Sequence, residues 1–203
     1  MRKLAIALVT LSALVFVNGF IGCGGEEAPA PMPTPTTTPT PTTFTTFSKY
    51  GFSFQYPAGL SVAEAEFAGG IGYTSGSVIV GGENRFFVIW ESMDRDTFYF
   101  APDLYLTLEV DGYLSAWEGH PEVLRVERSE WGDTSHAGQP MPFQSYSIEY
   151  KSGEPERCAG VAGAFYCEQT ERIFVLVTLD CNYDSAAEVA ARFYDYETSL
   201  VCY

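Results

Sequence analysis

The sequence contains few basic side chains. Its 11 lysines and arginines are set against 26 aspartates and glutamates, which gives a formal net charge of −15 at pH 7. Cleavage after residue 22 would remove Arg2 and Lys3 but no acidic residue, and would change this charge to −17. A surface this acidic repels phosphate groups, so we expect no nucleic-acid partner and no electrostatic attachment to anionic lipids.

The sequence also lacks the short motifs of several enzyme classes. It contains no G-x-S-x-G elbow, no P-loop and no H-E-x-x-H helix. Its histidines are His120 and His136, and the acidic residues Glu130 and Asp133 shortly precede the second one. Outside a helix this spacing does not make side chains converge, so we interpret residues 130–136 as a solvated polar loop. We therefore expect a non-enzymatic protein with no catalytic residue, metal or cofactor. The alternative is a metal-dependent envelope hydrolase that combines scattered acidic residues with a histidine.

The N-terminus carries an export pattern. Leu4–Val17 is almost wholly apolar, a length typical of a signal-peptide core and short for a membrane-spanning helix. The segment Phe20-Ile21-Gly22-Cys23 resembles the lipobox of bacterial lipoproteins, in which a small residue precedes a cysteine that is acylated and becomes the new N-terminus. We predict a lipoprotein signal peptide over residues 1–22 and lipid attachment, including palmitate, at Cys23. The protein would then lie at the cell membrane or envelope, on the extracytoplasmic side. An uncleaved signal anchor and an ordinary secretory signal are the alternatives.

Residues 23–43 form a second compositional region, rich in threonine and proline. Such a segment cannot bury a core, and its prolines favour an extended polyproline-like chain of about 3.1 Å per residue. We predict a tether that could hold a globular domain, residues 44–203, up to roughly 60 Å from a bilayer.

The globular region alternates strand and helix patterns. Two segments predict helices, 103–117, with Leu104, Leu108 and Leu114 among its apolar positions, and 185–196, which Asp184 or Ser185 can cap. Period-two or continuous apolar runs predict strands over 50–56, 77–80, 85–92, 124–131, 143–150, 161–167 and 172–179. Short connections favour antiparallel pairing, so we predict an α+β fold with an antiparallel β-sheet flanked by helices.

Several segments resemble the PsbP-like family. They are Tyr50–Pro57, with the sequence YGFSFQYP, together with Gly163–Tyr166, Arg172–Phe174 and Ser199–Cys202 at the end of the last helix. The resemblance implies an α/β sandwich around a central antiparallel sheet. The best-known members of that family are extrinsic proteins of photosystem II that help to retain manganese, calcium and chloride, and bacterial relatives are often lipoproteins of unknown role. No metal ligand of the family can be placed on a residue of this sequence.

Four cysteines follow Cys23, and they allow three pairings. Export makes disulfides expected, and the cysteines are too widely spaced for a zinc ribbon. If the last two strands form a hairpin around Gln169-Thr170, Cys158 lies opposite Cys181. Cys167 is then left for Cys202, so we predict disulfides 158–181 and 167–202.

The aromatic content suggests a binding surface. Most of the 13 tyrosines and 15 phenylalanines should lie in the core. Tyr99, Phe100 and Tyr105 lie beside a proline at the start of a helix, and could line a groove for a ligand or partner. Together these patterns predict a membrane-anchored binding or complex-assembly module, with an envelope protein as a candidate partner.

Overall fold

A computed structural model describes residues 43–203 except 69–73, 82–83, 153–156, 182 and 184; the side chains of residues 67, 68, 84 and 99 also lie outside the described part. The predicted signal peptide, Cys23 and the tether up to residue 42 lie outside the described residues.

The described chain forms two antiparallel sheets. The smaller one has the order β1-β2-β11, and the larger one has the order β3-β4-β5-β10-β9-β8-β6, with β7 paired to β8. The strands of the smaller sheet are β1 (Phe44–Lys49), β2 (Phe52–Pro57) and β11 (Val201–Cys202). Those of the larger sheet are β3 (Ser61–Ala68), β4 (Thr74–Gly81), β5 (Asn84–Ser92), β6 (Val123–Arg128), β7 (Gly132–His136), β8 (Gln139–Tyr150), β9 (Arg157–Cys167) and β10 (Arg172–Asp180).

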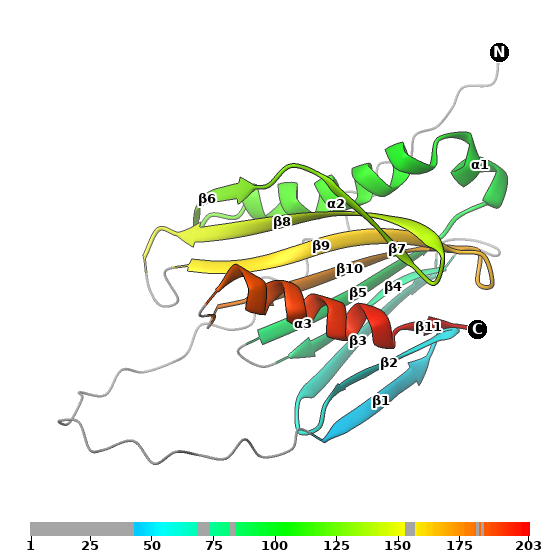
Figure 1. Ribbon diagram of the computed structural model, residues 1–203, viewed down its shortest axis with the longest axis horizontal. Helices are drawn as coiled ribbons and strands as arrows, with labels where there is room; N and C mark the ends of the chain where they lie inside the picture. Colours follow the sequence, from blue (N-terminus) through cyan, green and yellow to red (C-terminus); the bar gives the residue numbers. More distant parts are fainter. Residues whose placement is uncertain (1–42, 69–73, 82–83, 153–156, 182, 184) are drawn as a thin grey trace. The chain divides into compact units, whose positions relative to one another are not determined.

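Helices cover the large sheet on opposite faces (Figure 1). On one face lie α1 (Arg95–Phe100) and α2 (Pro102–Glu118); on the other lie α3 (Ala186–Ser199) and the small sheet. The central strand β10 shows why both faces are covered, because its apolar residues are continuous rather than alternating. Val175 and Val177 join the core beneath α2, here called the α2-side core, whereas Phe174 and Leu176 join the α3-side core.

The predicted α+β class is wrong, because the fold is β-rich. The described residues form eleven strands and three helices, and antiparallel pairing connects all the strands. The sequence patterns missed β1, β3, β7 and β11. Two of these have a plain physical reason: β7 has the sequence GDTSH, which contains no aliphatic or aromatic residue apart from its histidine, and β11 has only two residues.

Both predicted helices are present. The hydroxyl of Ser185 accepts a hydrogen bond from the Glu188 amide at 3.3 Å and so caps α3. Helix α2 starts at Pro102, where the absence of an N–H costs nothing because the first-turn amides have no intrahelical partner. Before it, Asp94 caps the short helix α1, which was not predicted.

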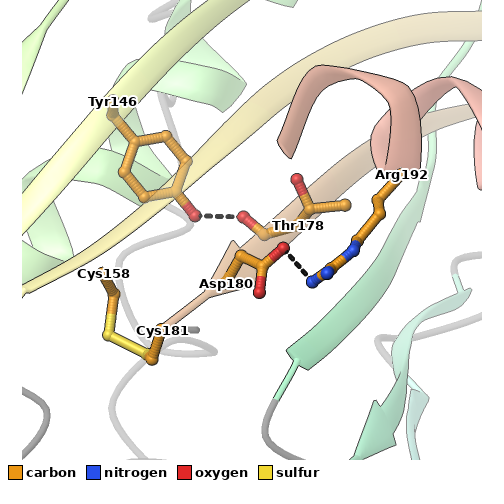
Figure 2. The surroundings of a disulfide bond; sticks show 6 residues. All are labelled: Tyr146, Cys158, Thr178, Asp180, Cys181 and Arg192. Atoms are coloured by element: carbon orange, nitrogen blue, oxygen red, sulfur yellow. Dashed lines mark hydrogen bonds and ion pairs between the residues drawn. A yellow bond between two sulfur atoms is a disulfide. The ribbon is translucent and has the colours of Figure 1, made fainter. Parts of the chain in front are cut away.

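The hairpin of β9 and β10 has the predicted register. Arg172 lies opposite Cys167 and Asp180 lies opposite Ala159, so Cys158 and Cys181 meet beyond the open end of the hairpin. The structure joins these two cysteines in the disulfide that the register predicted (Figure 2). The other two cysteines are free thiols, which differs from the second predicted disulfide.

A close backbone approach lies beside the disulfide. The Tyr146 hydroxyl donates a hydrogen bond of 2.6 Å to the Thr178 carbonyl, and the Arg192 guanidinium of α3 donates to the buried Asp180 carboxylate (Figure 2). Strand β10 leaves no room for a side chain at Gly160 of β9, because a Cβ there would lie 1.9 Å from the Thr178 oxygen. Only glycine fits that position of β9.

The small sheet begins with a two-residue turn. Tyr50 and Gly51 connect β1 to β2 with φ values of 58° and 82°, the positive pair that matches the twist of a tight hairpin. The free edge of β2 then pairs with β11, where Val201 lies opposite Ser53 and Cys202 opposite Phe52. The aromatic alternation of YGFSFQYP therefore encodes a turn and one strand, with Phe52 and Phe54 fully buried.

Candidate interaction surface

Three large apolar side chains are exposed along α1 and α2. Phe100 ends α1 and is 89% exposed, while Leu104 and Leu108 on α2 are 57% and 54% exposed. Their spacing of four residues places the two leucines one above the other on the helix. We call these three residues the apolar ridge. Exposed apolar side chains that adjoin one another, as Leu104 and Leu108 do, often mark a contact site on a monomer.

The opposite side of α2 holds the helix on the sheet. Leu106, Val110 and Leu114 are fully buried in the α2-side core. At 100° per residue, these positions point away from Leu104 and Leu108. Because the buried stripe already fixes the helix, the exposed leucines are not needed for packing. The sequence carries a signal for this, since apolar residues occur on both sides of one helix.

Acidic residues accompany the ridge. Helix α2 contains Asp103, Glu109, Asp111 and Glu118 and has no lysine or arginine. Two of these acidic residues, Asp111 and Glu118, form ion pairs of 2.9 Å each with the guanidinium of Arg128 on β6. Asp103 is exposed in the first turn, close in sequence to Leu104. The ridge is thus an apolar strip on an acidic helix.

Two further carboxylates lie between α2 and the sheet. Burial and, to a lesser extent, the charge of Glu109 on α2 raise the pKa of Glu91 on β5 to about 7. Burial also raises the pKa of Glu109. Each side chain is half-buried, so desolvation disfavours its charged form. At neutral pH, Glu91 therefore carries only part of its negative charge.

The residues predicted to line a groove have different environments. Phe100 is exposed and belongs to the apolar ridge, whereas Tyr105 is half-buried against the α2-side core. The side chain of Tyr99 lies outside the described residues. The surface around Phe100 is therefore described by the ridge of α1 and α2.

The interpretation of residues 130–136 as a solvated loop is wrong for His136. This residue ends β7, is 5% exposed, and its Nδ1 lies 2.6 Å from Oε1 of the buried Glu197 on α3. Asp133 and Glu130 are exposed, and Asp133 points to the other face of β7 because side chains alternate along a strand. His120 lies beyond α2, where its Nδ1 accepts a hydrogen bond of 3.3 Å from the Glu122 amide. Among the described residues, no three histidine, cysteine or acidic side chains are grouped to hold a metal ion.

The architecture is an antiparallel β-rich sandwich with helices on both faces of its larger sheet. It is similar to the solution structure of cyanobacterial PsbP (CyanoP) from Synechocystis sp. PCC 6803, with a TM-score of 0.54 and 14% sequence identity. The match covers 86% of this chain and 100% of that chain, so this chain has a PsbP-like fold, as the resemblance of its YGFSFQYP segment implied. No family model matches the sequence. No curated protein matches it either. In the described part of the chain, no helix has the length and apolar character needed to cross a bilayer.

Proposed function

We propose that this protein is a lipid-anchored extracytoplasmic binding protein, which docks through its apolar ridge onto a protein complex at the membrane. The export pattern of residues 1–22 and the lipobox-like segment before Cys23 support the anchor. The threonine- and proline-rich residues 23–43 support a tether long enough for the domain to reach a partner in the same membrane.

The apolar ridge is the observation that carries the docking proposal. Phe100, at 89% exposed, contributes nothing to the core, and Leu104 and Leu108 expose further apolar surface on α2. The surrounding acidic residues define the chemistry of the partner. An apolar strip on a helix with four acidic residues and no basic one fits a basic amphipathic helix, whose leucines would pack on the ridge and whose lysines would face the exposed Asp103.

The anchor has a direct test. Cys23→Ala in the full chain should move the protein from the membrane fraction to the soluble fraction, because no acyl group could then be attached. Cys202→Ala is the matched control, since it removes a cysteine of the folded domain and should leave the membrane fraction unchanged. Full membrane retention of the Cys23→Ala protein would refute the lipoprotein proposal in favour of an uncleaved signal anchor.

The docking surface can be tested with a defined probe. We expect a designed helical peptide of leucine and lysine to bind the purified full chain in fluorescence anisotropy, and a leucine–glutamate peptide of the same pattern not to bind. The double variant Leu104→Ser and Leu108→Ser should weaken binding at least about tenfold, since two apolar contacts are lost. Leu124→Ser, which changes a leucine that is 63% exposed on β6, is the control. Equal binding by the double variant would show that the peptide follows net charge alone, and would refute the ridge as the docking site.

A further inference from the structure

The two free cysteines lie together in the fold. Cys167 ends β9 in the large sheet and is 3% exposed, whereas Cys202 lies in β11 of the small sheet and is partly exposed. The thiol of Cys202 donates a hydrogen bond to the sulfur of Cys167. Helix α3 separates the two residues in sequence, so this contact is created only by the tertiary structure.

The main chain around the two thiols is held from several sides. Cys202 lies opposite Phe52 in the β2–β11 pair, and the Tyr203 amide donates a hydrogen bond of 2.9 Å to the Gly51 carbonyl. On the other side, Cys167 lies opposite Arg172, whose guanidinium donates to the Tyr50 carbonyl. The two backbones are therefore both held against residues 50–52, the turn and start of β2.

The thiol pair is separated from the existing disulfide. Cys158 and Cys181 lie at the opposite end of the β9–β10 hairpin, and Cys158 belongs to the α2-side core. Cys167 belongs to the α3-side core. Because the large sheet lies between the two pairs, a thiol of one pair has no direct path to the disulfide of the other.

We propose that Cys167 and Cys202 form a redox-active site, which exchanges with the disulfide of a small molecule such as glutathione disulfide or of a thiol oxidoreductase. The exchange converts the two thiols into one disulfide and reduces the disulfide of the oxidant to two thiols. Its oxidised form would covalently connect the small sheet to the large one.

The two cysteines have different roles in this exchange. The hydrogen bond from Cys202, followed by hydrogen bonds from Thr170 and the Gln169 main chain, lowers the pKa of Cys167 to about 6, despite the opposing effect of burial. Cys167 is therefore the more acidic thiol of the pair, and the same hydrogen bond raises the pKa of Cys202. The partly exposed Cys202 reacts first: the ionised Cys167 takes the Cys202 proton, the freed Cys202 sulfur bonds to one sulfur of the oxidant, and the thiolate that leaves then takes that proton from Cys167. The buried Cys167 thiolate then attacks the Cys202 sulfur and expels the second thiolate, which takes a proton from solvent.

The experiment uses the full chain in glutathione buffers of graded composition, followed by maleimide labelling and mass mapping. With excess reduced glutathione, Cys167 and Cys202 should both be labelled while Cys158 and Cys181 stay unlabelled. With excess glutathione disulfide, both labels should be lost together and the mass should fall by two hydrogens. Returning the protein to excess reduced glutathione should restore both labels without denaturant.

Single variants separate the two roles. Cys167→Ser should trap glutathione on Cys202, because the attacking thiolate is missing, whereas Cys202→Ser should take up several-fold less glutathione because Cys167 is buried. Three results would overturn the proposal: retention of both labels in glutathione disulfide, a bond that forms but opens only after unfolding, and equal uptake of glutathione by the two variants. The second result would mean a purely structural disulfide.

Discussion

The disulfide between Cys158 and Cys181 should be a main contributor to the stability of the domain. It closes a loop with a sequence separation of 23 residues, which includes almost the whole β9–β10 hairpin. Chain-entropy estimates for a loop of this length give about 3.4 kcal/mol, because the cross-link mainly restricts the unfolded chain. For a domain of this size, that free energy corresponds to a fall in Tm of about 7–14 °C when the bond is removed.

The test is thermal and urea unfolding of the double variant Cys158→Ala and Cys181→Ala, followed by circular dichroism. Both positions are changed together so that no new free thiol is created. The matched control is Cys167→Ala with Cys202→Ala, measured without reductant, which removes two sulfurs but no cross-link. If the first double variant loses less than about 1 kcal/mol relative to the second, the entropic reasoning is wrong for this loop.

Three further predictions concern single residues. Glu91→Gln should stabilise the protein by about 1–2 kcal/mol at pH 8 and by little at pH 4, measured by urea titration, with solvent screening of a half-buried group taken into account. The sign follows from the direction of the shift: a carboxyl pKa raised from 4.5 to about 7 gives stability that is present below pH 4.5 and is lost as the pH rises through 7. Between pH 4.5 and 7, the free energy of unfolding should therefore fall more steeply with pH in the wild type than in Glu91→Gln. Parallel curves for the two proteins would contradict this prediction. His136→Ala should cost about 2–4 kcal/mol, since Glu197 loses the imidazole that it contacts inside the core; a loss below 0.5 kcal/mol, roughly, would show that the pair is not stabilising. Gly160→Ala should destabilise the protein by about 3 kcal/mol or prevent folding, because the added methyl group overlaps a neighbouring strand. Its control is Gly112→Ala on the open side of α2, which should stabilise the protein by about 1 kcal/mol, with both variants measured by thermal unfolding.

Local patterns predicted the elements whose determinants are local. Helix α3 follows from apolar residues at helical spacing and from the cap at Ser185. The register of β9 and β10 follows from two apolar runs joined by a short polar segment, and it led to the disulfide at Cys158. In these cases one stretch of sequence contains both the pattern and the residues that end it.

The features that were missed depend on distant residues. Strand β3 has the sequence SVAEAEFA, whose alanines and glutamates favour helix, and it is a strand because it pairs with β4 along its whole length. His136 lies in a polar segment of the sequence, and in the fold it is buried in contact with Glu197, a residue 61 positions away. The apolar ridge could be predicted only in part. The helix pattern identifies leucines at positions 104 and 108, but it does not show which side of α2 packs on the sheet.

The position of β11 constrains when the domain can fold. Its residues complete a sheet with β2, so the strand at position 52 has a full set of hydrogen-bonding neighbours only after residue 202 is available. A chain that emerges N-terminus first, from a ribosome or a translocation pore, therefore presents the aromatic residues of β2 long before their partner arrives. Such non-local pairing slows folding and leaves aggregation-prone intermediates with exposed apolar surface. The small sheet is therefore complete only when both ends of the domain are present. A chain that ends before β11 should bind chaperones or be degraded rather than reach the folded state.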